Sequence, residues 1–445
     1  MTADAVTTAA PAAAAVTIAR DGRCELNWFS ALCDDDYEQL GVVDGSLRSS
    51  LEHCGDIVRT AQRLGFDNVL LPSGYALGID TVAFAAAMAP TIDVMRMLVA
   101  VRSGEMWVPQ LARQLAILDQ MLQGWLTVNI ISSDLPGQEL ASAPRYRRTL
   151  EIMTALRALL GGTRVDLDGE FLQLHLDPPG VRTVSGTCPP LYFGGLSDDA
   201  REVAAAAADV YLMWPDTLVG VAAVLGDMCI RAKRFGRSLR FGYRVHVVVR
   251  ETEAQARAAA AHLVAAVDDE QGARIRTASL DSESVGVRHR AELREAASLD
   301  DFVEDNLWTG IGRARSGCGA ALVGDSDQIL AKLGQYRDLG VDAFVLSGYP
   351  HRDEAEWFDR PVLPLLTHGP LPRESSAGQT PSIRSALRWP APPHPALALR
   401  WQRPLHLPSV CVDFLRVPAL MSERTADVRS DITVRATWPR WAISP

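Results

Sequence analysis

The sequence predicts an α/β fold, a closed (β/α)8 TIM barrel, on three observations. Between about residues 24 and 367, apolar strand-like runs alternate with amphipathic helical stretches, and eight runs can be counted, each followed by a helix. Polar and glycine residues gather where the runs end, which is where a barrel places its function. The chain has 445 residues, 48% of them apolar, and can bury a core of this size. A doubly wound open sheet gives a similar alternation and stays as an alternative.

The predicted elements follow one another in regular order. Apolar runs predict strands at 24–32, 66–74, 94–104, 125–134, 189–195, 210–214, 240–249 and 343–348. Amphipathic periodicity predicts helices at 46–65, 81–90, 108–124, 145–162, 198–208, 217–234 and 326–340. A polar insert separates the helix at 145–162 from the next strand.

Three segments fall outside this rhythm. Residues 1–22 lack the basic region followed by an apolar core that marks a secretion signal. We therefore expect a disordered segment there and not a secretion signal. Residues 270–325 form a long insertion before the last βα unit, and its glycine-rich part with two arginines predicts a mobile lid. The tail at 368–445 lacks Lys and periodicity, which predicts an irregular or disordered segment after a barrel domain at 23–367.

Composition excludes several classes of function. The formal net charge of -10 argues against a nucleic-acid partner and against an anionic membrane surface. No apolar run reaches the ~18 residues that a membrane-spanning helix needs. The seven cysteines are scattered without Cys-x-x-Cys spacing, which indicates free thiols in a reducing cytoplasm and neither a disulfide framework nor a zinc site.

The strand "RFGYRVHVVVRE" at 240–251 carries two unusual residues. Because strand side chains alternate between faces, Arg244, His246 and Val248 share one face. A single polar residue in a strand usually faces water, but the valines indicate a strand that is covered on both faces. A guanidinium and an imidazole that are buried side by side would need partners, so the pair is a candidate site.

The run "LYFGGLSDDA" suits an anion. Gly195, Leu196 and Ser197 lie between a strand and a helix, where glycine allows close approach and free helix amides can hold a phosphate. Ser197 can equally be an ordinary helix cap, with the acidic residues after it answering the helix dipole. The motif alone leaves both interpretations open.

Polar residues at other strand ends can reach a heterocycle or a phosphate. Asn129 and Ser132 end the strand at 125–134 and can contact the edge of an isoalloxazine, although a plain turn is the alternative. Tyr146, next to Arg145 at the start of the following helix, can add a phosphate contact or lie at the surface.

Three more candidates lie at the ends of other strands. Ser73 and Trp214 follow the second and sixth strands. Tyr349, just past the last strand, can donate a hydrogen bond into the barrel mouth or serve as a rim aromatic.

Six ordered blocks together resemble the FMN-dependent alkanesulfonate monooxygenases, within the bacterial luciferase-like flavin monooxygenases. The blocks are "LVAVRSGEMWVPQLARQ", "PPLYFGGLSDDA", "VYLMWPD", "RFGYRVHVVVRETEAQA", "NLWTGIGRARSGCGAALVGD" and "AFVLSGYPH", within about residues 24 to 367. The resemblance implies a barrel that takes reduced FMN from a separate NAD(P)H-dependent flavin reductase and uses O2 to cleave the C–S bond of an alkanesulfonate or related organosulfur compound. The products would be an aldehyde and sulfite, and the enzyme a cytoplasmic homo-oligomer, a dimer or tetramer.

The resemblance also implies roles for individual residues. The implied catalytic residues are His246, Arg244, Arg315, Tyr349 and Trp214, and the implied FMN-binding residues are Ser73, Asn129, Ser132, Tyr146, Gly195, Leu196 and Ser197. Arg244 would hold an anionic oxygen, and Arg315 would close over the site and exclude water. His246 would act as an acid or base, and a neighbouring cation disfavours its protonated form, which suits a base.

The chain departs from the family at "SGYALGID", where the family has "TGRSCED". This chain has neither the arginine nor the cysteine of that family segment. Of the properties that the resemblance implies, the choice of substrate is therefore the one that it supports least. Two other functions fit the same barrel. One is hydride transfer with the deazaflavin F420, and the other is a flavin-binding barrel without catalysis, which the retained Arg244, His246, Arg315 and Tyr349 argue against.

Overall fold

A computed structural model describes residues 23–75, 78–268, 270, 272, 285–315 and 317–372. The predictions for the lead-in at 1–22 and for the tail from 373 onward lie outside these residues, as does part of the predicted lid, at 273–284. Among the described helices, none has the length and apolarity needed to cross a membrane.

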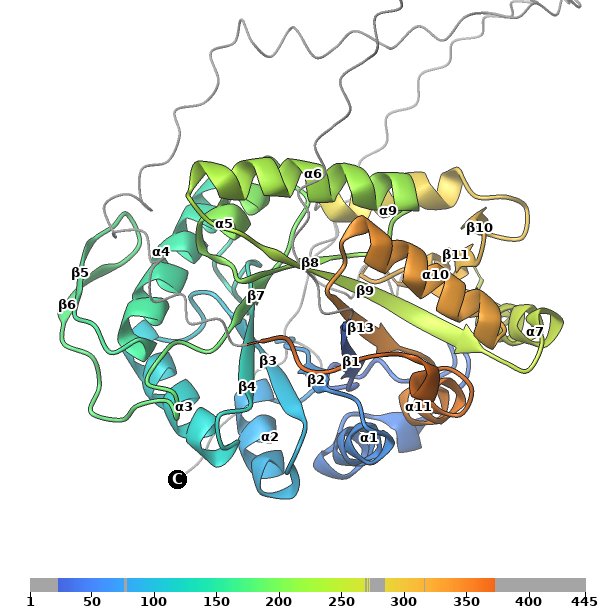
Figure 1. The fold of residues 1–445 in the computed structure, drawn as a ribbon, viewed down its shortest axis with the longest axis horizontal. Coiled ribbons are helices and arrows are strands. Elements are labelled where there is room, and N and C mark those ends of the chain that lie inside the picture. The colour runs from blue at the N-terminus through green and yellow to red at the C-terminus, as the bar shows by residue number, and fades with distance from the viewer. Residues whose placement is uncertain are drawn as a thin grey trace, which may run out of the picture. The chain divides into compact units, whose positions relative to one another are not determined.

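Eight parallel strands close into a barrel (Figure 1). They are β1 (Glu25–Phe29), β2 (Asn68–Leu71), β3 (Arg96–Arg102), β4 (Leu126–Ile131), β7 (Leu191–Phe193), β8 (Val210–Met213), β9 (Arg240–Val249) and β13 (Ala343–Ser347). Each strand pairs with the next in this order, and β13 returns to pair with β1. The predicted (β/α)8 barrel is therefore confirmed, and the open-sheet alternative is wrong.

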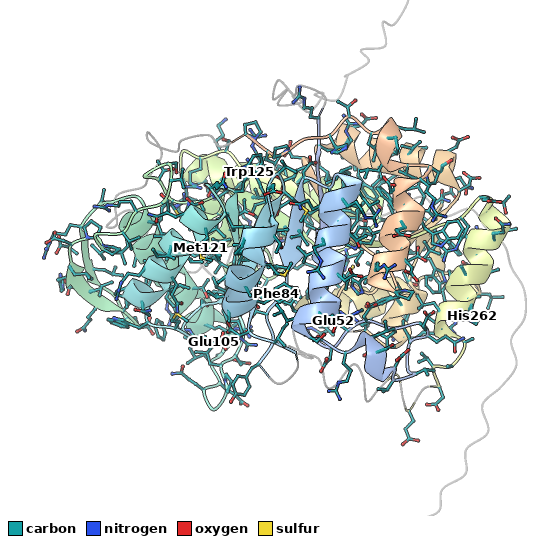
Figure 2. All side chains as sticks on the ribbon, turned by 90° about the horizontal axis from the view of Figure 1, so that it is seen from below. Glu52, Phe84, Glu105, Met121, Trp125 and His262 are labelled. Carbon is teal, nitrogen blue, oxygen red and sulfur yellow. The ribbon has the colours of Figure 1, made fainter. Side chains whose placement is uncertain are left out.

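Helices follow the strands as the alternation predicts (Figure 1). They are α1 (Leu51–Leu64), α2 (Thr81–Met88), α3 (Val108–Met121), α4 (Ser142–Leu160), α5 (Asp198–Ala207), α6 (Leu218–Arg234), α7 (Glu253–Val264), α10 (Ser326–Leu339) and α11 (His351–Asp359). Figure 2 labels residues of both kinds on them: Phe84 of α2 is buried, whereas Glu52 of α1 is exposed. Burial of the apolar helix faces on the barrel supplies most of the stability that such helices lack alone.

Side-chain caps start several helices where the sequence has the required residue. Ser50 accepts a hydrogen bond from the His53 amide before α1, and Thr217 accepts one from Gly220 before α6. Asp325 and Gln328 form a reciprocal capping box at α10. These local signals explain why the predicted helix at 217–234 agrees with α6 within one residue.

The predicted polar insert is a hairpin, and the predicted lid contains regular structure. The hairpin pairs β5 (Val165–Asp168) with β6 (Gln173–Leu176). The described part of the lid holds α9 (Val285–Glu295), β10 (Phe302–Glu304), β11 (Leu307–Trp308), the 3-10 turn η3 (Gly310–Arg313) and β12 (Ala321–Gly324). Strand β12 pairs in parallel with the carboxyl-terminal part of β9, from His246 to Val249. The lid is therefore anchored beside the strand that carries Arg244 and His246.

A buried polar network fills the amino end of the barrel. Glu25 accepts hydrogen bonds from Arg96 at 3.0 Å and from the Tyr192 hydroxyl at 2.7 Å. The guanidinium of Arg96 also lies 5.8 Å from the ring of Trp125, which Figure 2 labels at this end. A buried charge is tolerated only with such partners, so this end is structural.

The first residues of the predicted tail belong to this network. The Leu371 amide donates to Glu25 at 2.9 Å, and the Leu371 carbonyl accepts from Arg96 at 2.8 Å. His368 also pairs with Asp67 at 3.0 Å. The predicted domain boundary at 367 and the predicted irregular tail remain predictions; residues 368–372 pack on the barrel, and the only regular pairing among them is the isolated bridge of His368 to Cys24.

Candidate functional site

A cavity of about 460 Å³ lies at the carboxyl ends of the barrel strands, and residues of the lid, including its helix α9, form part of its lining. Ten of the twelve predicted site residues line it: Ser73, Asn129, Ser132, Tyr146, Gly195, Leu196, Ser197, Trp214, Arg244 and Arg315. Its size is within the range of cofactor sites. The remaining two, His246 and Tyr349, are buried behind the lining residues.

Arg244 is held deep in the cavity by an aromatic face. Its guanidinium carbon lies 4.3 Å from the ring centroid of Phe29, and its NH1 donates to the backbone carbonyls of Val245 and Val345. Burial lowers the pKa of Arg244 from its ordinary value, yet arginine stays protonated in proteins. No carboxylate among the described residues forms an ion pair with it, so its charge is available to a ligand.

The hydrogen bonds of His246 fix its tautomer. Nε2 lies 3.1 Å from the Cys318 carbonyl, which can only accept, so Nε2 carries the proton. Nδ1 then accepts from the Ser347 hydroxyl at 2.6 Å. Burial, with the cations Arg244 and Arg315, holds the pKa of His246 well below its ordinary value, so the imidazole is neutral. This agrees with the protonation state that the sequence predicts for a base.

Tyr349 stacks on His246 with ring centroids 4.9 Å apart. Its hydroxyl is buried and has no hydrogen-bond partner among the described residues. Burial raises the pKa of Tyr349 above its usual range, although Arg315 acts in the opposite direction. The phenol is therefore protonated, with its donor unused by the protein.

Arg315 comes from the lid and pairs with the first loop. Its NH2 lies 3.1 Å from Asp35 Oδ2, and its guanidinium lies 5.9 Å from the Tyr349 ring. Burial lowers the pKa of Arg315, but the phenol and the Asp35 carboxylate outweigh burial and the pKa is raised. The lid charge is thus held over the cavity.

The glycine turn after β7 approaches its neighbours closely. A Cβ on Gly194 would lie 2.1 Å from the Leu212 backbone oxygen, and Gly195 has a φ of +148°, which only glycine adopts readily. Tyr211 donates to the Gly195 carbonyl at 2.6 Å. Ser197 caps α5 through the Ala200 amide and also lines the cavity, so the two interpretations of this motif are compatible.

The wall next to the glycine turn carries hydroxyl groups, because β4 pairs with β7. Ser132 accepts a hydrogen bond from Thr149 at 2.8 Å, and Thr149 is also hydrogen-bonded to Ser103. Asn129 is half-buried on β4 and faces the same cavity. These groups offer donors and acceptors along one side of the cavity.

Sequence reasoning missed several residues of the site. Arg288 lines the cavity from α9, Cys318 lines it from the lid, and Asp35 holds Arg315. Tyr75, from the segment that departs from the family, is 67% exposed and is not among the lining residues. Of these residues, only Cys318 could have been found from the local sequence, because it lies within the block "NLWTGIGRARSGCGAALVGD". The others reach the site through contacts between segments that are far apart in the chain.

The charge of the lining is one-sided. Among the described residues that line the cavity, four are arginines, namely Arg145, Arg244, Arg288 and Arg315. None of these lining residues is Asp or Glu. Arg145 and Arg315 pair with Asp134 and Asp35, which lie outside the lining. Such a cavity attracts anions.

Comparison with known proteins gives one family. The family described as luciferase-like monooxygenase matches residues 33–343. The chain is 60% identical over 355 residues to a sulfoquinovose monooxygenase of Novosphingobium aromaticivorans, covering 78% of this chain and 98% of the relative. It is 51% identical over 370 residues to a sulfoquinovose monooxygenase of Agrobacterium fabrum, covering 82% and 95%.

Solved structures agree on the fold. The structure of DmoA from Hyphomicrobium sulfonivorans matches with a TM-score of 0.65 at 17% identity, covering 82% of this chain and 96% of that one. The EDTA monooxygenase of Chelativorans sp. BNC1 matches with a TM-score of 0.62 at 17% identity, covering 82% and 98%.

Proposed function

Since the chain belongs to the luciferase-like monooxygenase family, we propose that it is a reduced-flavin-dependent monooxygenase that cleaves the C–S bond of sulfoquinovose. Sulfoquinovose is a hexose with a sulfonate on C6, so the reaction would leave an aldehyde at C6 and release sulfite. The names of the two relatives support this substrate over a simple alkanesulfonate.

The observation that carries the proposal is the charge of the cavity. Four arginines and no carboxylate line it among the described residues, which suits two anions at once, the phosphate of FMN and a sulfonate. Arg244 and Arg288 form no ion pair with the described carboxylates, so a ligand anion would meet no competing partner there.

The lining fits a flavin mononucleotide. Gly195, Ser197 and the start of α5 would hold the phosphate together with Arg145 and Tyr146. Asn129, Ser132 and Ser73 would meet the polar edge of the ring system. When bound in its reduced form, FMN supplies the electrons that activate O2.

The protein's own groups would then bind the sulfonate, hold protons and exclude water. Arg244 would bind an anionic oxygen of the substrate, held in place by the Phe29 face. Neutral His246 would accept a proton through Ser347, and Tyr349 would donate its unused hydrogen bond. Arg315 would close the mouth and, with Trp214, keep water away from the reacting atoms.

The proposal implies partners. A separate flavin reductase would supply reduced FMN from NAD(P)H, so both proteins would work in the cytoplasm. The chain would form a homodimer or homotetramer.

The test is sulfite release from sulfoquinovose and a panel of alkanesulfonates, with purified reductase, NAD(P)H and FMN, for wild type and His246→Ala. We expect sulfite from sulfoquinovose with wild type and a loss of about 10²-fold or more with the variant. If sulfite is released from alkanesulfonates but not from sulfoquinovose, the proposed substrate is wrong. If the protein binds flavin but releases sulfite from no sulfonate, the proposed cleavage of the C–S bond is wrong. Activity with F420 in place of reduced FMN and O2 would overturn the cofactor.

A further inference from the structure

One of the four arginines of the cavity has no part in the roles proposed above. Arg145 would meet the flavin phosphate, Arg244 would bind the sulfonate, and Arg315 would close the mouth. Arg288 lines the same cavity from α9, where its side chain is exposed, and it pairs with no carboxylate in the described part of the chain. The five N–H donors of its guanidinium are therefore available to a ligand.

Two contacts hold α9 beside the cavity. His289 Nε2 lies 2.7 Å from Oδ2 of Asp216, which is on the loop after β8, and Arg294 Nη1 donates to the Gly312 carbonyl at 2.6 Å. The first contact ties α9 to the barrel, and the second ties it to η3 of the lid. Because Arg288 directly precedes His289, its backbone is held at the edge of the cavity.

Arg288 lies nearer to solvent than Arg244 does. Arg244 is 4% exposed and lies within β9 against the ring of Phe29, whereas Arg288 is exposed. A substrate whose sulfonate is bound by Arg244 would extend from there toward α9. In sulfoquinovose the sulfonate is on C6, so the sugar ring and its hydroxyl groups would occupy the outer part of the cavity.

The outer part of the cavity carries groups that suit a sugar ring. Trp214 lies beside α9, since Trp214 and His289 line one small pocket next to the cavity, and Trp214 is 37% exposed. The face of an indole can cover the C–H face of a sugar, and the planar fork of a guanidinium can donate to two neighbouring hydroxyl groups. An alkyl chain would leave these donors unused.

We propose that Arg288 is a specificity-determining residue that donates two hydrogen bonds to neighbouring hydroxyl groups of the sulfoquinovose ring, with the indole of Trp214 packed on the ring beside it. The proposal rests on the proposed function and specifies how its substrate is chosen. Arg288 takes no part in breaking the C–S bond. It favours a hexose sulfonate over an alkanesulfonate of the same length, because only the hexose offers hydroxyl oxygens to the guanidinium.

The test compares two ligands that share a sulfonate and a chain of six carbons, sulfoquinovose and hexane-1-sulfonate. Their dissociation constants are measured by calorimetry under argon with reduced FMN present, so that no turnover occurs. For Arg288→Met we expect the dissociation constant of sulfoquinovose to rise about tenfold, and that of hexane-1-sulfonate to change less than about threefold. The affinity for FMN should also change less than about threefold.

Two further variants separate hydrogen bonding from charge. Arg288→Lys keeps the positive charge but loses the planar fork, so it should still bind sulfoquinovose at least about threefold more weakly than wild type does. The control is Arg113→Met, at an exposed arginine of α3 that does not line the cavity. It should leave both dissociation constants within about twofold of wild type.

Several outcomes would overturn the proposal. Equal weakening of both ligands in Arg288→Met would place Arg288 at the sulfonate, and a loss of FMN affinity with unchanged sulfonate binding would place it at the flavin. Wild-type affinity for sulfoquinovose in Arg288→Lys would mean that charge alone acts, and an equal effect in Arg113→Met would mean that the site is not specific.

The proposed function fails in a different way. If wild type in air, supplied with reduced FMN, releases no sulfite from sulfoquinovose, the proposed reaction is wrong. The contact between Arg288 and the sugar would still stand if sulfoquinovose binds and Arg288→Met weakens it selectively.

Discussion

Arg315 and Asp35 form an ion pair at 3.1 Å between the lid and the loop after β1, although 280 residues separate them. Asp35 is nearly buried, and its second oxygen has no partner among the described residues. The pair therefore ties the lid over the cavity at a point where solvent screens it little.

Asp35→Asn should loosen this tie. With the charge attraction gone, water reaches the cavity more often, and more reduced flavin is oxidised without product. We expect sulfite formed per reduced flavin consumed to fall about threefold to tenfold. The control is Asp301→Asn, which weakens the exposed lid pair with Arg313 at a left-handed position that Asn tolerates. Equal coupling in both variants would contradict the role of Asp35.

Burial of neutral His246 should make the protein sensitive to acid. Its folded-state pKa lies well below 6.5, so below pH 6.5 the unfolded chain binds a proton that the folded chain does not. This contribution to stability is present above pH 6.5 and is lost as the pH falls, by at most about 1.4 kcal/mol per pH unit.

Urea unfolding at pH 7.5 and 5.5 measures this effect. We expect His246→Gln to lose less stability than wild type between the two pH values. The control is His175→Gln, because His175 is exposed and paired with Asp168 and Asp166, which raises its pKa. An equal loss in wild type and His246→Gln would show that the imidazole is not buried in neutral form.

The contact of His289 with Asp216 should make helix α9 sensitive to alkali. Nε2 of His289 lies 2.7 Å from Asp216 Oδ2, and this hydrogen bond, aided by Glu292, raises the pKa of His289. A raised pKa means that the stabilisation is complete below pH 6.5 and is lost as the pH rises through the folded-state value.

Hydrogen exchange of the α9 amides, corrected for the intrinsic effect of pH, follows this change. We expect α9 of wild type to lose protection as the pH rises from 6 to 9, and α9 of His289→Gln to show little change over that range. His262→Gln, at an exposed histidine of α7 that Figure 2 labels, is the control and should behave as wild type does. Protection that is independent of pH in wild type would refute the contact.

Residues 368–372 should be required for a stable barrel. A chain that ends at 367 loses the two backbone hydrogen bonds of Leu371 to Glu25 and Arg96, and also its buried side chain. Burying such a side chain contributes about 1.5–3 kcal/mol. We expect a chain ending at 367 to unfold at clearly lower urea concentration than one ending at 372, with the slope of the transition little changed. Identical midpoints would mean that the segment only covers the barrel end.

The alternation of apolar runs and amphipathic helices in the sequence was sufficient to predict the barrel and part of the site. Eight apolar runs, each with a following helix, are a repeat that a closed parallel barrel satisfies, although closure itself was observed only in the structure. The two-residue spacing of Arg244 and His246 put both on one strand face, because strand side chains alternate. Ser197 marked the start of α5, since helix caps are local.

Only the tertiary structure determined the contacts between segments that lie far apart in the chain. Asp35 meets Arg315, Asp36 meets His351, and Leu371 reaches Glu25 across hundreds of residues. No local periodicity encodes such pairs, because they arise where a closed barrel brings its first and last segments together. The charge state of His246 was likewise expected only as a tendency, since its pKa depends on burial and on cations that the folded chain alone places around it.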